Sequence, residues 1–121
     1  MYKRVLVCGG RKFNDYNLLA RSLDELFYSR GWHTEVDEDG NWLPVGQIIA
    51  GKAKGADTLA IDYAVVNWMD FQEYPADWNT HGKAAGLIRN QQMLDEGKPD
   101  LVVAFPGGRG TADMVRRAKK A

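Results

Sequence analysis

The chain has 121 residues, with 16 basic and 16 acidic side chains, so its formal net charge at pH 7 is zero. This length fits a single hydrophobic core, and we expect residues 1–121 to form one domain. The balanced charge gives no general attraction to nucleic acid or to a membrane surface, so we expect neither as a partner.

Cysteine and histidine are scarce, with one cysteine, Cys8, and two histidines in the whole chain. A single cysteine cannot form an intramolecular disulfide, which favours an intracellular, cytoplasmic protein. We expect no bound metal ion and no resident cofactor. The apolar run after the basic pair at residues 3 and 4 has only four residues, too few for a signal peptide or a membrane span.

The chain begins with a predicted strand followed by a predicted helix. Residues 3–8 ("KRVLVC") are apolar and rich in β-branched side chains, which indicates a buried strand. After a glycine-rich turn, leucines and a phenylalanine recur at helical spacing as far as Gly31, a residue typical of a helix end. Asn14 or Asp15 would cap the start of this helix.

Residues 31–46 form an insert that interrupts this pattern. Asp39-Gly40 is a typical turn dipeptide, and the apolar residues on both sides of it predict a hairpin. The acidic side chains around the turn lack the spacing of an EF-hand, which favours a solvated tip over a metal site. The insert could cover a cleft, contact another subunit, or do neither.

Three further predicted strands, at residues 47–50, 71–74 and 100–105, are each followed by a helical pattern. The polar character of the strand at 71–74 suggests that it lies near a sheet edge. The first of the last two helices carries Leu87, Ile88, Gln91 and Leu94, and the second has Ala112, Val115 and Ala118 on one side. The alternation of strands and helices predicts an α/β fold with a mainly parallel sheet of four or five strands and an inserted hairpin.

The carboxyl ends of parallel strands meet at one edge of the sheet, and ligands bind there, where the strand order reverses. The loops at 9–11, 51–57, 77–90 and 106–111 would therefore line one cleft. They supply glycines, helix N-termini and basic side chains without a matching carboxylate cluster, which suits an anion such as phosphate. The expected ligand-binding residues are Gly9, Gly10, Arg11, Gly51, Lys54, Gly55, Asp57, Asp77, Trp78, Arg89, Asn90, Pro106, Gly107, Gly108, Arg109, Gly110 and Thr111.

Some of these residues have an equally good structural explanation. Asp57 and Thr111 could each cap a helix instead of contacting a ligand, and Trp78 could stack on a base or pack beneath a loop. The stretch "GKAKGAD" lacks the Gly-Lys-Ser/Thr end of a Walker A loop, and no G-x-G-x-x-G follows the first strand. An NTPase and an ordinary NAD-dependent dehydrogenase are therefore not expected.

Four stretches, "VCGGRKFNDY", "AGKAKGADTLA", "YPADWNTHGKAAGLIRNQQML" and "DLVVAFPGGRGTADMVRRA", together resemble the YspA-type, YpsA-related branch of the SLOG superfamily. The resemblance implies a Rossmann-like three-layer domain that binds nucleotides or nucleotide-derived ligands such as relatives of ADP-ribose. Relative to this family, the chain ends at "RRAKKA", where a further glycine and a closing strand would be expected. An uncovered sheet edge would favour a homo-oligomer.

The stretch "PGGRGT" is also similar to LOG enzymes of the same superfamily, which hydrolyse the N-glycosidic bond of nucleoside 5′-monophosphates. This similarity implies Arg89 as a catalytic arginine and Asp113 as a candidate acid in an N-glycosidic hydrolase. The glutamate of the LOG motif, however, falls on Met114. Methionine cannot supply the carboxylate that an oxocarbenium-like transition state needs, so ligand binding without hydrolysis is favoured over this alternative.

Overall fold

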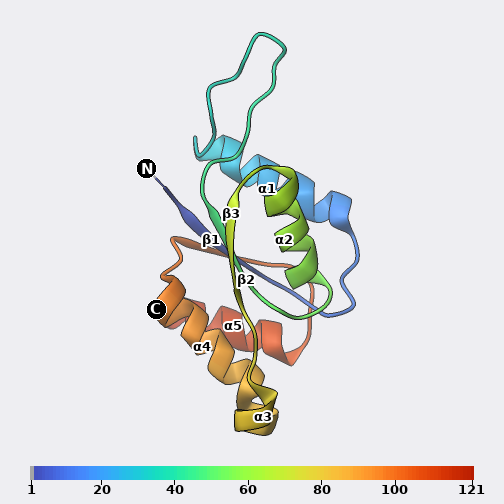
Figure 1. The fold of residues 1–121 in the computed structure, drawn as a ribbon, viewed down its shortest axis with the longest axis vertical. Coiled ribbons are helices and arrows are strands. Elements are labelled where there is room, and N and C mark those ends of the chain that lie inside the picture. The colour runs from blue at the N-terminus through green and yellow to red at the C-terminus, as the bar shows by residue number, and fades with distance from the viewer. Residues whose placement is uncertain (1) are drawn as a thin grey trace.

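The computed structural model describes residues 2–121 (Figure 1). In chain order the elements are β1 (Arg4–Cys8), α1 (Tyr16–Ser29), β2 (Gln47–Gly51), α2 (Ala56–Val66), β3 (Asp70–Tyr74), α3 (Trp78–His81), the 3-10 turn η1 (Gly82–Ala84), α4 (Ala85–Gly97), β4 (Leu101–Ala104) and α5 (Arg109–Lys120). No helix within residues 2–121 is long and apolar enough to cross a membrane.

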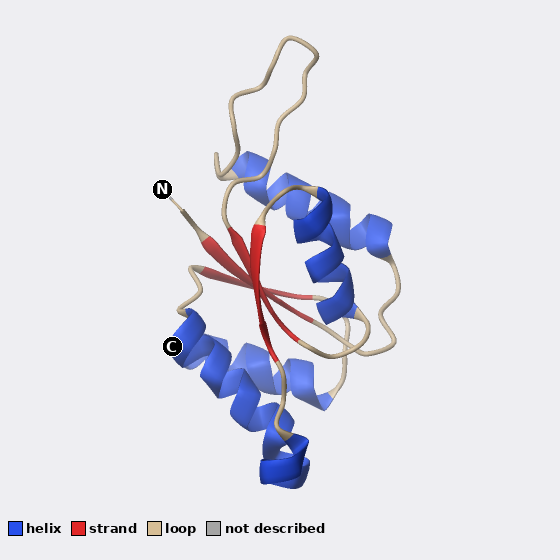
Figure 2. Ribbon diagram, viewed as in Figure 1, coloured by secondary structure: helices blue, strands red, loops and turns tan. Residues whose placement is uncertain are grey.

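The strands form one 4-stranded sheet in the order β3-β2-β1-β4, and all neighbouring strands are parallel. The predicted α/β class and parallel sheet are thereby confirmed (Figure 2). The position of β3 at an edge agrees with the polar Gln72 and Glu73 in its sequence. The chain runs outward from β1 to β3 and then returns to β4, so the strand order reverses between β1 and β4.

Helices cover both faces of the sheet, which gives three layers (Figure 2). Successive side chains of a strand point to opposite faces. Val5 and Val7 of β1 therefore pack in a core with α1 and α2, while Leu6 and Cys8 pack in a second core with α4 and α5. The right-handed connections that parallel strands require account for this distribution of helices.

Helices α4 and α5 bury only part of the sets of residues that their helical spacing brings together, namely Leu94 and, in part, Ala118. Leu87 and Ile88 are exposed, while α4 buries Ala85, Asn90, Met93, Leu94 and Gly97. Ala112 is exposed, and α5 buries Asp113 and Met114. Apolar spacing does not identify the whole buried face, because two of the inward side chains, Asn90 and Asp113, are polar. Asn90 Nδ2 donates to Asp113 Oδ2 at 3.1 Å, and this bond lets both be buried between the helices.

Residues 31–46 fold back as the expected hairpin, but without regular strands. One isolated antiparallel bridge joins His33 to Pro44, and Gly40 makes the turn with a φ of 81°. The insert connects the end of α1 to the start of β2, so it leaves the body at the amino ends of the strands (Figure 1). This position is opposite the edge where the carboxyl ends meet, and the insert does not cover that edge.

Gly9, directly after β1, is a position where a side chain would disturb the packing of the core. A Cβ atom there would lie 2.6 Å from Ala56 Cβ and 3.1 Å from Phe105 Cβ. We expect Gly9→Ala to lower the free energy of unfolding by about 1–3 kcal/mol, because α2 and the loop after β4 would have to move apart. Urea denaturation followed by circular dichroism measures the change.

Gly110→Ala is the matched control, because nothing lies within 4 Å of a Cβ at Gly110. Alanine also favours the helix that contains this position, so the control should be as stable as wild type or more stable by up to about 1 kcal/mol. Equal stability of Gly9→Ala and wild type would contradict the close packing of Gly9 against Ala56 and Phe105.

Candidate functional site

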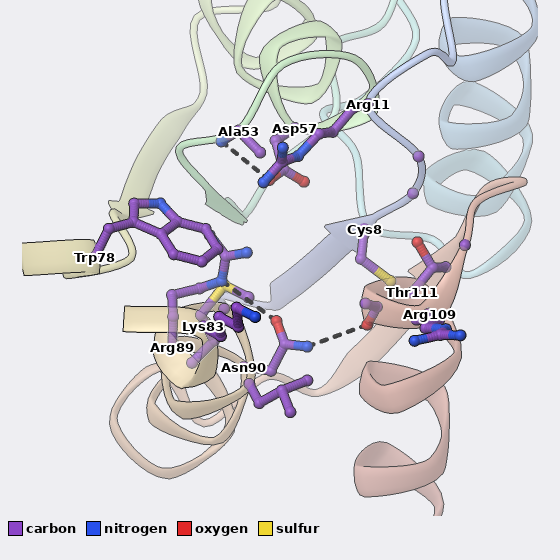
Figure 3. A pocket seen from close by; sticks show the side chains of 17 residues that line it. Cys8, Arg11, Ala53, Asp57, Trp78, Lys83, Arg89, Asn90, Arg109 and Thr111 are labelled. Atoms are coloured by element: carbon purple, nitrogen blue, oxygen red, sulfur yellow. Dashed lines mark hydrogen bonds between the residues drawn. The ribbon is translucent and has the colours of Figure 1, made fainter. Parts of the chain in front are cut away.

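A cavity of about 450 Å³ lies at the carboxyl edge of the sheet, where the strand order reverses between β1 and β4 (Figure 3). The loops after β1, β2 and β3 and the first turns of α4 and α5 contribute to its wall. The lining residues are Cys8, Gly9, Gly10, Arg11, Ala53, Asp57, Trp78, Lys83, Gly86, Leu87, Arg89, Asn90, Met93, Gly108, Arg109, Gly110 and Thr111.

The loops after β1, β2 and β4 meet at Gly10. Its N–H donates to the carbonyl of Pro106 at 2.9 Å, and its carbonyl accepts from the N–H of Ala56 at 3.1 Å. A Cβ atom on Gly10 would lie 2.9 Å from Gly107 Cα. The close approach of these backbones requires glycine and fixes the starts of α2 and α5 beside the same turn.

The start of α5 supplies backbone donors to the cavity. Gly108 is its N-cap residue and makes no side-chain capping bond, and residues 108–111 all line the cavity. The first N–H groups of a helix have no partner within the helix. A Cβ on Gly108 or Gly110 would meet nothing within 4 Å, so neither residue obstructs the approach of an anion to these donors.

Arg89 enters the cavity from α4 and is held in place by two hydrogen bonds. Its Nη1 donates to the carbonyl of Tyr74 and its Nε to Asn90 Oδ1, both at 3.3 Å. Asn90 Nδ2 in turn donates to the carbonyl of Gly110 at 3.1 Å, which ties α4 to α5 (Figure 3). Burial lowers the pKa of Arg89, an effect opposed by the charge of Asp57 and reinforced by that of Arg11.

Asp57 is the acidic member of the cavity wall. It lies in the first turn of α2 and is only 6% exposed. Its Oδ2 accepts from the N–H of Ala53 at 3.3 Å. Burial raises the pKa of the Asp57 carboxyl, while the positive charge of Arg89 lowers it in part. Among the side chains described for the cavity wall, Asp57 is the sole carboxylate.

Gly51 makes room for Asp57 and Arg89 to lie side by side. A Cβ atom on Gly51 would come 2.7 Å from Asp57 Oδ2 and 2.8 Å from Arg89 Cζ. Asp57 is not the helix cap, because Gly55 occupies the N-cap position of α2 and makes no side-chain capping bond. The buried carboxylate is therefore placed beside a cation and toward the cavity.

Trp78 and Arg11 lie together at the side of the cavity near β3. The Trp78 side chain is half exposed, and the Arg11 guanidinium carbon lies 5.9 Å from the centre of its ring. Asp77 acts as the N-cap of α3 and accepts from the N–H of Thr80 at 3.1 Å. The cap holds the start of α3, while the tryptophan ring lines the cavity.

Most of the residues expected at the cleft line the cavity, and the remainder shape its loops. Those that line it are Gly9, Gly10, Arg11, Asp57, Trp78, Arg89, Asn90, Gly108, Arg109, Gly110 and Thr111. Those that do not line it are Gly51, Lys54, Gly55, Asp77, Pro106 and Gly107. Of this second group, Gly51, Gly55, Pro106 and Gly107 pack directly behind the lining residues.

Ala53, Lys83, Gly86 and Leu87 line the cavity and lie within the loop ranges expected at the cleft, whereas sequence reasoning missed Cys8 and Met93. Met93 lies on the same face of α4 as Gly86, Arg89 and Asn90, since residues 86, 89, 90 and 93 have helical spacing. That spacing was the available signal. Cys8 forms part of the floor, where burial and then the charge of Asp57 raise its pKa to about 12, so it stays a neutral thiol.

Asp113 does not line the cavity and makes structural contacts instead. Its oxygens accept from Arg116 Nη2 at 2.9 Å, Arg117 Nε at 2.7 Å and Asn90 Nδ2 at 3.1 Å. Burial raises the pKa of the Asp113 carboxyl, but the hydrogen bonds and charges of these partners outweigh burial and hold the pKa below its ordinary value. Within residues 2–121, no group of three or more acidic, histidine or cysteine side chains is arranged to hold a metal ion.

The sequence model of the YspA, cpYpsA-related SLOG family matches residues 3–81. The chain belongs to this family. The match includes the loops after β1 and β2 and Trp78, but it ends before Arg89 and "PGGRGT". The chain is also 36% identical to the Gene 61 protein of Mycobacterium phage D29, over 98% of this chain and 90% of the relative. No solved structure gives a significant match.

The depressed pKa of Asp113 predicts a pH-dependent contribution to stability. A carboxyl whose pKa is lower in the folded state stabilises the fold above its unfolded pKa of about 4, and the contribution disappears as the pH falls through the folded value. We expect Asp113→Asn to lower the free energy of unfolding by about 1–2 kcal/mol at pH 7, with the difference becoming smaller as the pH is lowered from 7 through the folded pKa of Asp113. Urea denaturation across this pH range measures it.

Asp95→Asn provides a control, because Asp95 is an exposed carboxylate of α4 whose one described bond is from Gln91 Nε2. Its replacement should change stability little at any pH. A fully stable Asp113→Asn variant at pH 7 would contradict the structural role of Asp113.

Proposed function

We propose that this SLOG-family chain binds a phosphate-bearing, nucleotide-derived small molecule, such as a nucleoside monophosphate or a relative of ADP-ribose or NAD. The observation that carries the proposal is the open N-terminus of α5 in a cavity with excess positive charge. Arg11, Lys83, Arg89 and Arg109 line this cavity with Asp57 as the one acid among the described lining residues. This balance favours an anion over a cation.

The dimensions of the cavity support a small ligand. A volume of about 450 Å³ lies within the range of roughly 300–1,000 Å³ that is common for small-molecule sites. The phosphate would accept from the first N–H groups of α5 and from the Thr111 hydroxyl, with Arg109 and Arg89 adding charge. Trp78 would supply an aromatic face for a base.

Arg89→Gln is expected to weaken the binding of AMP and ADP-ribose by roughly tenfold to hundredfold, because a charge-assisted bond to phosphate is lost. Isothermal titration calorimetry on the wild type and the variant measures this change. Arg21→Gln is the matched control, since Arg21 is exposed on α1 and its described bond is to the carbonyl of Asn17. Failure of AMP, ADP-ribose and NAD to bind the wild type would contradict the proposed function.

A second candidate function, N-glycosidic hydrolysis, is favoured by one observation. Asp57 is a buried carboxyl with a raised pKa beside Arg89, a combination found at many catalytic acids and bases. Met114, at the position of the LOG glutamate, is fully buried and cannot replace it. Because Asp113 is occupied by its arginine partners, a hydrolase would depend on Asp57 for its carboxylate.

Hydrolysis predicts specific products from the wild-type protein. Incubation with AMP would yield free adenine and ribose 5-phosphate, which liquid chromatography separates from the starting nucleotide. Both products should be absent with Arg89→Gln. Quantitative recovery of intact AMP from the wild type, with AMP bound, would exclude hydrolysis of AMP and favour the binding function.

A further inference from the structure

Asp57 presents an unused hydrogen-bond acceptor to the cavity. Its Oδ2 accepts from Ala53, whereas no residue of the described chain donates to its Oδ1. Oδ1 is also absent from the set of fully buried polar atoms without a partner, so part of its surface is open. Since Asp57 is only 6% exposed and lines the cavity, that open surface faces the cavity.

A largely buried carboxylate oxygen without a protein donor is poorly solvated, so a donor from a ligand in the cavity would stabilise it. The nearby Arg89 does not fill this role, since its described bonds are to Tyr74 and Asn90. A ligand phosphate would be repelled by the carboxylate. The group that fits beside Oδ1 is therefore a donor without negative charge, and on a nucleotide the sugar hydroxyls have this chemistry.

The strand order fixes where this donor lies along the ligand. Trp78 follows β3, Asp57 follows β2, and the N-terminus of α5 follows β4. Adjacent strands are about 4.8 Å apart, so Asp57 is placed about one spacing from the tryptophan side and two spacings from the α5 side. Figure 3 shows Trp78 and Thr111 on opposite sides of the cavity view, with Asp57 between them along the upper wall.

This order matches the covalent order of a nucleoside 5′-phosphate. A base against Trp78 and a phosphate at the start of α5 leave the sugar beside Asp57. The hydroxyls at C2′ and C3′ of a ribose are uncharged donors on that middle part of the molecule. Each part of the nucleotide would therefore meet a suitable group: the base an aromatic ring, the sugar hydroxyls a carboxylate, and the phosphate the N–H groups of α5.

We propose that Asp57 selects ligands with sugar hydroxyls, because its Oδ1 accepts a hydrogen bond from the ribose cis-diol. The site therefore discriminates ribonucleotides from 2′,3′-dideoxyribonucleotides. This inference rests on the proposed nucleotide-binding function, but it holds whether or not the bound nucleotide is hydrolysed. The proposed contact gives the Asp57 carboxylate a role in binding that is separate from phosphate binding.

The first test uses the wild-type protein and requires no variant. Calorimetric titration compares AMP, 2′-deoxy-AMP and 2′,3′-dideoxy-AMP, together with the corresponding series of GMP. We expect the dideoxy compounds to bind roughly tenfold to hundredfold more weakly than the ribonucleotides, since a bond to a charged acceptor is lost. The 2′-deoxy compounds show which hydroxyl contributes more.

The second test is the isosteric Asp57→Asn variant, with Asp62→Asn as its control. Asp62 is exposed on the same helix, so its replacement removes the same charge outside the cavity. Asp57→Asn should reduce the preference for ribonucleotides to within about threefold, because an amide accepts a weaker hydrogen bond than a carboxylate. Asp62→Asn should keep the wild-type preference.

The possible results distinguish a failure of the sugar contact from a failure of nucleotide binding itself. If ribo- and dideoxyribonucleotides bind the wild type equally well, the role of Asp57 is overturned while nucleotide binding stands. If Asp57→Asn weakens both series equally, Asp57 acts on the fold or the phosphate site and the inference fails. If no nucleotide binds the wild type, the proposed function fails, and the sugar contact fails with it.

Discussion

Backbone from three separate loops meets at Gly10, and the geometry of the candidate site depends on this approach. The N–H of Gly10 bonds to the loop after β4, and its carbonyl bonds to the first residue of α2. Side chains at Gly9, Gly10 or Gly107 would each collide with a neighbouring loop. Because the backbones touch directly, the starts of α2 and α5 have fixed positions on either side of β1, and both point at one cavity.

The polar groups of the cavity are coupled through this scaffold. Asn90 joins Arg89 to the carbonyl of Gly110 and to Asp113, so one amide connects the arginine of α4 with the first turn of α5. Burial disfavours the charged forms of Arg89 and Asp57 alike, and each partly offsets the effect on the other. An anion at the α5 side would add a favourable partner for the arginine, while Oδ1 of Asp57 would still lack a donor from residues 2–121.

Several features of the site were predictable because they depend on local sequence. Glycine-rich loops follow apolar strands at Gly9, Gly51 and Pro106, and the alternation with helices places those loops at one sheet edge. The inward faces of α4 and α5 were only partly predictable from apolar spacing, which picks out Leu94 and Ala118 but not Asn90 and Asp113. Asn90 and Asp113 are buried because they bond to each other across 23 residues of chain, and hydrophobicity carries no record of such a pair.

The sequence by itself determined the α/β class, the family and the set of loops that supply glycines and cations to one edge. Only the tertiary structure decided which acid faces the cavity. Asp57 and Asp113 both lie in the first two turns of a helix after a glycine-rich loop, although Arg116 and Arg117 follow Asp113 at a spacing that allows ion pairs within the helix. Asp113 is saturated by Arg116, Arg117 and Asn90, whereas Asp57 keeps one oxygen open. Two of the donors to Asp113 come from its own helix, and the packing of α4 against α5 adds the third, Asn90. Asp57 has no such partners among the described residues and faces the cavity.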